Sequence, residues 1–327
     1  MKALEQTEIQ LGYVPLLDCI ALLWAQHQGY FIEQGLNVSL VKEASWASLR
    51  DRLAFGFLDA AHCLSAMLPA AALGDDQLGI PLQTPLVLST NKAFISLSQQ
   101  LCHELNIGLH DCVEQTATKV VDAFKNGQTL QLAHVFKHSI HHYSLREWLA
   151  LVDYEVAAQY PFCTLPPPYM VEAISKQMID GFCVGEPWNT QAELEGYSQI
   201  ITSSQEIIPS VADKVLAVTA AWAEQHPQSL AALKAAIVQA QNHLRDLEDF
   251  SEVWQLLKDY QIVRFNCSTH VHVKACYKIQ NIIQNLVPIE VNPQQADFEW
   301  LVTQNCKWQQ LDISQTLQQE IARQCIL

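Results

Sequence analysis

The segment Glu43-Ala44-Ser45-Trp46 combines hydrogen-bond donors with the start of a helix. Ser45 is placed as an N-cap, and the helix is expected to begin at Trp46. Free backbone N–H groups and the helix dipole make such a start receptive to an anion, and an indole N–H adds a directional donor. The commoner alternative is that Ser45 only caps and Trp46 only packs on a sheet. Trp46 is therefore a candidate ligand contact with a structural alternative.

A second candidate turn lies within residues 181–189. A buried strand is expected to stop at Gly185, whose missing side chain lets a ligand approach the backbone, and Pro187 is expected to open a helix. An ordinary strand-to-helix turn fits the same residues. Glu186 would repel an anion if it pointed inward, so we expect it to face a structural partner.

Two side chains could add hydrogen bonds or charge. His141 lies at or near the beginning of a predicted helix, where an imidazole can donate to an oxyanion. Lys214 directly precedes an apolar strand and would supply the single positive charge that a buried monovalent anion needs. Taken singly, a histidine or a lysine in such a position is more often exposed to solvent than bound to a ligand. Their shared location with Trp46 and Gly185, at strand ends and helix starts, favours a site for a small oxyanion.

Several well-known catalytic and cofactor motifs are absent from the sequence. There is no Gly-x-Gly-x-x-Gly or phosphate-loop sequence, no Gly-x-Ser-x-Gly elbow and no His-Glu-x-x-His helix. Two histidine clusters could suggest a metal, but adjacent histidines on a helix point in different directions, and no carboxylate or cysteine completes a recognisable ligand set for the first cluster. Solvated or packed histidines are the commoner reading of both. These clusters are His138, His141 and His142, and His270 and His272 beside Cys267 and Cys276. We therefore expect no cofactor, no metal and no enzymatic activity.

The elements that must position the candidate residues alternate between strands and helices. Period-two apolar runs at 9–14, 37–41 and 59–62 are separated by helical patterns at 19–28 and 46–55. This βαβ order predicts an α/β fold with mainly parallel sheets covered by helices. Functional loops should then lie at the carboxyl ends of the strands.

The 327 residues exceed one typical core, so two lobes are expected. Extended crossings around 88–93 and 202–213 separate a middle unit from two flanking ones. We predict that residues 1–92 and 213–327 form lobe 1 and that residues 93–212 form lobe 2. A cleft between lobes is the natural ligand site.

Charge and patterning limit the partners and the compartment. Nineteen basic against 34 acidic residues give a formal charge of −15, and we find no basic stripe, so direct nucleic-acid binding is not expected. A basic protein partner would be attracted. The start of the sequence has no apolar signal region and no stretch reaches membrane-spanning length. Ten cysteines without a Cys-x-x-Cys pair indicate buried thiols, so we expect a cytoplasmic protein without a membrane segment.

The chain resembles, over nearly its whole length, the nitrate/bicarbonate-binding proteins of ABC transporters. The most specific motifs are Glu43-Ala44-Ser45-Trp46 and Cys183-Val184-Gly185-Glu186-Pro187-Trp188, and residues 12–19, 58–62, 84–88 and 298–304 continue the likeness. The resemblance implies a two-lobed, type II periplasmic-binding fold that clamps a small planar oxyanion. By motif matching, it places the ligand contacts at Trp46, His141, Gly185 and Lys214.

Two positions bear on which anion the resemblance implies. An amide contact of the family would align near Ala93, so either Lys92 replaces it or the pocket prefers another ion. The bicarbonate branch carries an acidic residue where this chain has Lys214. Because a carboxylate needs a co-bound cation to hold an anion, the lysine favours nitrate or nitrite.

The expected cytoplasmic location makes the chain similar to the nitrate/nitrite sensors of the NasS-like branch. Such sensors hold an RNA-binding antiterminator of the ANTAR type and release it when the anion binds. We therefore predict a ligand-gated regulator of nitrate assimilation. The alternatives are the substrate-binding component of an ABC transporter and, supported only by scattered histidines, an enzyme similar to the pyrimidine-precursor synthases.

Overall fold

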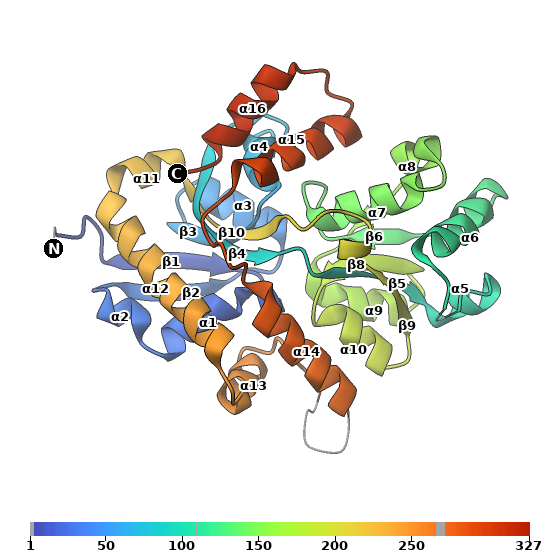
Figure 1. The fold of residues 1–327 in the computed structure, drawn as a ribbon, viewed down its shortest axis with the longest axis horizontal. Helices are drawn as coiled ribbons and strands as arrows, with labels where there is room; N and C mark the ends of the chain where they lie inside the picture. Colours follow the sequence, from blue (N-terminus) through green and yellow to red (C-terminus); the bar gives the residue numbers. More distant parts are fainter. Residues whose placement is uncertain (1–2, 109, 266–271) are drawn as a thin grey trace. The chain divides into compact units, whose positions relative to one another are not determined.

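A computed structural model describes residues 3–108, 110–265 and 272–327. The chain divides into two compact units, each with its own five-stranded sheet. Unit 1 comprises Met1–Thr90, Val211–Val263 and Tyr277–Leu327, and unit 2 comprises Asn91–Ser210 and Arg264–Cys276. In Figure 1 the sheet of unit 1 contains the blue strands, and the sheet of unit 2 lies among the green helices.

The sheet of unit 1 has the strand order β2-β1-β3-β10-β4. β1 runs parallel to β2 and β3, whereas β10 runs antiparallel to its neighbours β3 and β4. β10 is buried at every position except its last, as expected of a strand covered on both faces. The bounds are β1 Glu8–Tyr13, β2 Asn37–Lys42, β3 Ala60–Leu64, β4 Leu82–Thr90 and β10 Ala212–Thr219.

The sheet of unit 2 repeats this plan with the order β7-β6-β8-β5-β9. β6 is parallel to β7 and β8, and β5 is antiparallel to β8 and β9. The predicted α/β fold with two mainly parallel sheets is confirmed, and in each sheet one antiparallel strand is the first strand after a crossing. The bounds are β5 Ala93–Ser98, β6 Leu132–His134, β7 Cys163–Thr164, β8 Gly181–Gly185 and β9 Ser198–Ser203.

Helices of unit 1 bury apolar stripes against the sheet and against one another. In α12 the buried residues Leu230, Leu233, Ile237 and Leu244 recur at helical spacing, and this helix packs on α1. The bounds are η1 Leu17–Cys19, α1 Ile20–His27, α2 Tyr30–Glu33, α3 Trp46–Ala54, α4 Met67–Ala72, α11 Ala220–Gln225, α12 Pro227–Asp246, α13 Ser251–Asp259, α15 Gln295–Gln309 and α16 Gln315–Gln324. α14 spans Val273–Leu286.

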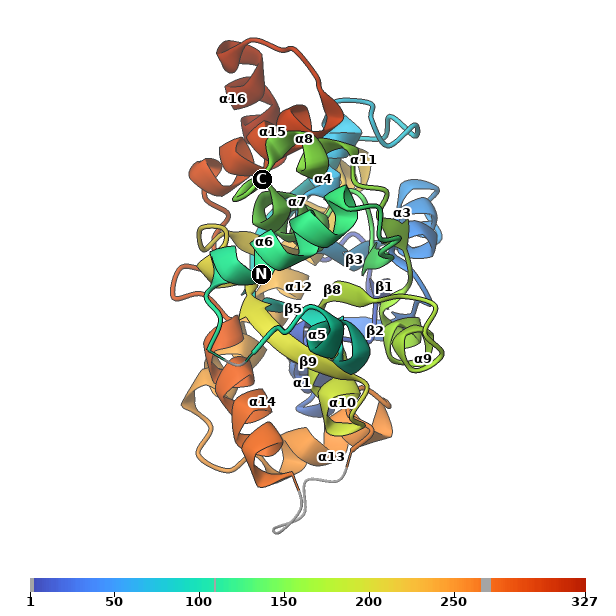
Figure 2. The ribbon, with the colours of Figure 1, turned by 90° about the vertical axis from the view of Figure 1, so that its right-hand side faces the viewer.

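In unit 2, α7 and α10 cover opposite faces of the sheet, as both views show (Figures 1 and 2). α7 packs on α6, α8 and β8, and α10 packs on α9 and β9. The bounds are α5 Gln99–Glu104, α6 Val113–Lys125, α7 Ile140–Ala150, α8 Tyr154–Gln159, η2 Pro167–Tyr169, α9 Met170–Ser175, α10 Trp188–Leu194 and η3 Ser204–Glu206.

The crossings contain more regular structure than predicted. Residues 88–90 belong to β4 and Ala93 begins β5, so only Asn91 and Lys92 connect the two strands. The second crossing contains η3 before β10 begins at Ala212. Among the helices that the structure describes, none is long and apolar enough to cross a membrane.

The described cysteines include eight free thiols and one disulfide-bonded residue. Cys276 forms the disulfide, which differs from the expectation of thiols throughout. Of the free thiols, Cys112 is exposed and Cys163 half-buried, and the others are buried as predicted: Cys19, Cys63, Cys102, Cys183, Cys306 and Cys325.

Gly181, at the start of β8, provides a test of packing in unit 2. A Cβ atom at this position would lie 2.5 Å from Leu97 Cδ2, 2.8 Å from the Ser96 carbonyl oxygen and 2.9 Å from Leu132 Cδ2. Because the Ser96 backbone of β5 must move and the Leu97 and Leu132 side chains must repack to admit a methyl group, we expect Gly181→Ala to lower the free energy of unfolding by roughly 1–3 kcal/mol, measured by urea denaturation. Gly108→Ala is the control, since an added Cβ there meets no atom within 4 Å. Equal stability of the two variants would show that β5 and β6 yield to the methyl group without cost.

Candidate functional site

The start of α3 in unit 1 has the predicted cap. The Ser45 hydroxyl accepts a hydrogen bond from the Ser48 N–H group at 3.1 Å, and α3 begins at Trp46. Glu43 is buried and held from two sides, because it accepts from the Ser48 hydroxyl at 2.6 Å and lies 2.8 Å from Arg52 Nη1. These contacts fix the backbone from which the Trp46 side chain projects.

Trp46 is completely buried, yet its indole Nε1 has no hydrogen-bond partner among the described residues. Its ring centroid lies 5.5 Å from that of His62 and 5.7 Å from Lys214 Nζ. Burying an N–H group without a partner costs about 1–3 kcal/mol. Trp46 therefore packs in the core, as the structural alternative required, and also presents an unused donor.

Lys214 lies on β10, an internal strand of the sheet, which pairs it with Leu64 of β3 and Ser89 of β4. Its ammonium is completely buried and contacts two carboxylates, Asp213 Oδ2 at 2.7 Å and Asp18 Oδ2 at 3.1 Å. Lys214 therefore supplies a positive charge, as predicted, but its two counter-charges were not predicted. A buried ammonium requires counter-charges, and the fold supplies two of them.

His62 of β3 joins the same group of side chains. Its Nε2 lies 2.9 Å from Asp18 Oδ1, so Asp18 connects the imidazole to Lys214. His62 Nδ1 and Asp213 Oδ1 are buried and have no hydrogen-bond partner among the described residues. We call Asp18, His62, Asp213 and Lys214 the charge cluster.

The members of the charge cluster shift one another's protonation. Burial would raise the pKa of Asp18, but Lys214 and His62 lower it well below its usual range. Burial and the charge of Asp18 raise the pKa of Asp213 despite the neighbouring Lys214. Burial would lower the pKa of Lys214, but the two carboxylates raise it above the ordinary value. The ammonium and the Asp18 carboxylate therefore form the stable ion pair, and Asp213 is the carboxyl that more readily takes a proton.

Asp18, His62 and Asp213 were not among the predicted site residues. A signal was present, because Asp18 and His62 each interrupt an otherwise apolar run within segments that carry the family resemblance. Buried ionisable residues in such runs need partners. The identity of those partners depends on which strands are neighbours, and local sequence does not contain that information.

In unit 2, Gly185 is the last residue of β8 and pairs with Ala93 of β5. The Glu186–Pro187 peptide bond is cis, and α10 begins at Trp188, one residue later than predicted, with Pro187 as its N-cap. Glu186 is buried and accepts hydrogen bonds from Thr190 N at 3.0 Å and Thr190 Oγ1 at 2.7 Å. The expectation that Glu186 faces a structural partner is confirmed.

His141 is the second residue of α7, whose N-cap Ser139 accepts a hydrogen bond from His142 N at 3.1 Å. The His141 side chain is completely buried, unlike a surface histidine. Because α7 packs on β8, His141 and Gly185 belong to neighbouring elements. Lys92, suggested as a replacement for the family amide near Ala93, is half-buried, and burial lowers its pKa.

A second group of histidines packs beside His141 in unit 2. The rings of His134 and His142 lie 4.6 Å apart, and Arg146 Nε donates to His142 Nε2 at 3.3 Å, which requires His142 to be neutral. Burial lowers the pKa of His134 to about 4 and that of His142 well below its ordinary value. Within the described ranges, no three His, Cys, Asp or Glu side chains are arranged to hold a metal ion. His270 and Cys267 of the other cluster lie outside the described residues.

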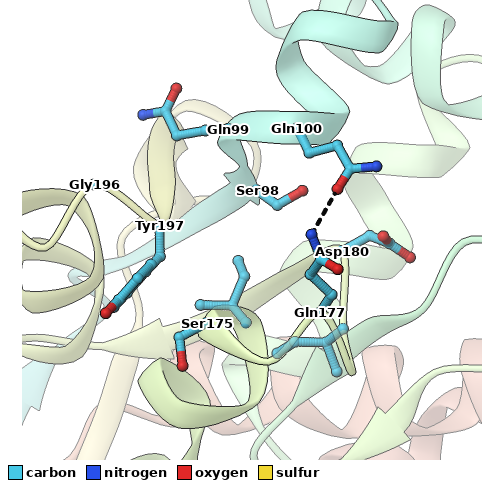
Figure 3. A pocket seen from close by; sticks show the side chains of 10 residues that line it. Ser98, Gln99, Gln100, Ser175, Gln177, Asp180, Gly196 and Tyr197 are labelled. Carbon is cyan, nitrogen blue, oxygen red and sulfur yellow. Dashed lines mark hydrogen bonds between the residues drawn. The ribbon is translucent and has the colours of Figure 1, made fainter.

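A surface pocket of unit 2, with a volume of about 180 Å³, contains none of the predicted contacts (Figure 3). Gln177 Nε2 donates to Gln100 Oε1 at 3.0 Å across it, and the two amides point toward each other in the figure. Its polar groups are therefore partly used by one another. The predicted residues instead divide into Trp46 and Lys214 in unit 1 and His141 and Gly185 in unit 2.

Comparison with known proteins identifies related sequences. The model of the NMT1-like family matches residues 2–258. The chain is 30% identical to the bicarbonate transport ATP-binding protein CmpC of Synechocystis sp., over 98% of this chain and 49% of that protein. It is also 30% identical to the nitrate/nitrite binding protein NrtA of Nostoc sp., over 78% of this chain and 58% of that protein. The chain spans about half the length of the curated relatives it matches.

Solved structures with the same fold include two periplasmic binding proteins. The periplasmic nitrate-binding protein NrtA from Synechocystis PCC 6803 matches with a TM-score of 0.79 and 23% identity, covering 99% of this chain and 87% of that one. The alkanesulfonate-binding protein SsuA from Xanthomonas axonopodis pv. citri matches with a TM-score of 0.72 and 13% identity, covering 99% of both chains. These likenesses establish the periplasmic-binding-protein-like fold.

The neutral histidines of unit 2 predict acid sensitivity. An unfolded histidine binds protons below its ordinary pKa of 6.5, whereas folded His134 does so only near pH 4. Stability should therefore fall as the pH drops through this range, and His134 alone accounts for at most roughly 3 kcal/mol. We expect His134→Gln to reduce the fall in urea midpoint between pH 7 and pH 4. His103→Gln, on an exposed position of α5, should retain the wild-type fall; an identical fall in both variants would contradict the assignment.

Proposed function

The chain belongs to the NMT1-like family, and from this premise we propose that it binds nitrate or nitrite. The observation that carries the proposal is the fully buried indole N–H of Trp46, unpartnered among the described residues, beside the Lys214 ammonium. A monovalent oxyanion accepts hydrogen bonds and carries the charge that such a donor and cation favour. Relatives named for nitrate or nitrite binding support the same ligand class.

The proposed contacts are the predicted ones. We propose Trp46 as a donor and Lys214 as a charge in unit 1, and His141 as an imidazole donor and Gly185 as a backbone contact in unit 2. Near Ala93, where the family has an amide contact, the two predicted alternatives stand: Lys92 replaces the amide, or the pocket prefers another ion. Nitrate and nitrite are favoured over bicarbonate because Lys214 stands where the bicarbonate branch has an acidic residue.

We further propose that binding serves sensing in the cytoplasm. The anion shifts an equilibrium between two states of the chain and thereby changes its affinity for an ANTAR-type antiterminator protein. The formal charge of −15 supports a basic, RNA-binding partner of this kind. The second candidate, the substrate-binding component of an ABC transporter, is supported by the transport and binding names of the relatives.

Trp46→Phe is the sharpest test of the binding site, because it removes the indole N–H and keeps an aromatic ring. We expect calorimetric titration with nitrate or nitrite to show a roughly 10- to 100-fold loss of affinity, as for one hydrogen bond to a charged group. Trp24→Phe is the matched control, since this buried indole already donates to His243 Nδ1 at 3.1 Å.

Lys214→Ala should abolish binding, but it also leaves Asp18 and Asp213 buried without their cation and thus destabilises unit 1. Loss of affinity in that variant alone would not distinguish a contact from a damaged fold. No heat with nitrate, nitrite or bicarbonate in the unaltered chain would contradict the proposal, and so would equal affinity of Trp46→Phe and Trp24→Phe.

Sensing and transport predict different partners and compartments. If the chain is a sensor, it should co-elute in gel filtration with an ANTAR-type antiterminator of the same organism and dissociate when nitrate is added. Trp46→Phe should then need roughly 10- to 100-fold more nitrate for dissociation, in proportion to its lost affinity. Cell fractionation should find the native protein in the cytoplasm. A periplasmic location, or co-elution that nitrate leaves unchanged, would contradict the sensor proposal and leave the binding proposal intact.

A further inference from the structure

We propose that the anion binds together with one proton, which the charge cluster of Asp18, His62, Asp213 and Lys214 takes up from solvent. This inference rests on the proposed function, because it concerns the same site. It assigns a role to Asp18, His62 and Asp213, which are not among the predicted ligand contacts. The effective ligand is then a monovalent oxyanion plus a proton.

The charge balance of the cluster is the first step. Its side chains are one ammonium, two carboxylates and one imidazole, and each residue is at most 7% exposed. The Lys214 ammonium and the two carboxylates, when both are ionised, carry a net charge of −1. A monovalent anion beside Trp46 would raise this to −2 within a buried region, which is energetically unfavourable. An anion and a proton together add no net charge.

The geometry provides two positions for the proton. Asp213 Oδ1 is buried without a hydrogen-bond partner among the described residues, while Asp213 Oδ2 is held by Lys214 at 2.7 Å. His62 Nδ1 is likewise buried without a described partner, while His62 Nε2 lies beside Asp18. Uptake forms one O–H bond on Asp213 or one N–H bond on His62. No other bond changes, and either product is a new donor close to Lys214.

Protonation states within the cluster favour Asp213 over Asp18. Asp18 is stabilised as a carboxylate by both Lys214 and His62, which lower its pKa. Burial and the neighbouring Asp18 charge raise the pKa of Asp213. The cluster therefore contains one firmly ionised carboxylate and one that protonates more easily, an arrangement typical of two acids that share a site.

Other described groups around the cluster form no ion pair with its carboxylates. Lys42 acts electrostatically on Cys19, and Arg50 acts on Cys63 but pairs with Asp51. The thiols of Cys19 in η1 and Cys63 in β3 have pKa values raised by burial, for Cys63 to about 12, and remain neutral. From α15, Asp297 accepts a hydrogen bond from Ala212 N at 3.1 Å, and burial raises its pKa. Trp46 of α3 and Ser89 of β4 carry no charge. Among the residues that the structure describes, Lys214 is the cation that contacts both carboxylates.

Calorimetric titration with nitrate measures the coupling directly. Nitrate itself does not titrate in the working range, so a dependence of the binding heat on buffer ionisation enthalpy counts protons taken up by the protein. Titrations between pH 6 and pH 9, each pH in two buffers that are effective there and differ in ionisation enthalpy, should show uptake of about one proton per anion at the upper end. Affinity should fall about tenfold per pH unit where uptake is complete.

Substitutions identify the proton acceptor. Asp213→Asn imitates the protonated carboxyl and should raise the affinity at pH 9 toward the wild-type value at pH 6, with proton uptake reduced. His62→Gln should remove uptake if the imidazole is the acceptor. Glu172→Gln, which neutralises the surface carboxylate paired with Lys176, is the matched control and should keep wild-type coupling.

The outcomes separate this inference from the proposed function. Nitrate binding with no proton exchange at any pH would overturn the inference and leave nitrate binding standing. Full uptake retained in both Asp213→Asn and His62→Gln would also overturn it, because neither position would then hold the proton. Absence of binding heat at every pH would overturn the proposed function itself. The proton count of the unaltered protein remains decisive if a variant does not fold.

Discussion

The fold of unit 1 must balance one buried charge, the Lys214 ammonium on an internal strand of its sheet. Lys214 lies on a strand covered on both faces, so its charge cannot be hydrated and must be balanced by protein groups. The fold brings Asp18 from the segment after β1, His62 from β3 and Asp213 from β10 itself. The ion pairs of Lys214 thus connect elements that are far apart in the sequence.

Unit 2 meets a similar demand by keeping its buried histidines neutral. Arg146 donates to His142, which is possible only while that imidazole has an unprotonated nitrogen. Glu186 is the buried acid, and Thr190 satisfies it with two hydrogen bonds from the next turn of chain. The buried ions of both units are thus held by neighbouring side chains, whereas the buried indole N–H of Trp46 has no partner among the described residues.

Features that depend on neighbouring residues could be predicted from the sequence. The cap at Ser45, the end of β8 at Gly185 and the structural role of Glu186 all follow from local chemistry. The alternation of strands and helices likewise predicts the two sheets. The counter-charges of Lys214 could not be predicted, because they depend on β10 lying between β3 and β4, a pairing across more than a hundred residues. The sequence thus predicted the charge of Lys214 but not its partners Asp18 and Asp213.

The insertion of β10 also sets the order in which the two sheets can be completed on the ribosome. The strands of unit 2 are all synthesised by Ser203, whereas the sheet of unit 1 lacks its fourth strand until Thr219 has been made. β3 and β4 can therefore pair with β10 only after all the strands of unit 2 have been synthesised. The strand that closes the gap also delivers Lys214 and Asp213. The last strand of the unit 1 sheet and the ion pair of Asp213 and Lys214 are thus synthesised together, after the strands of unit 2.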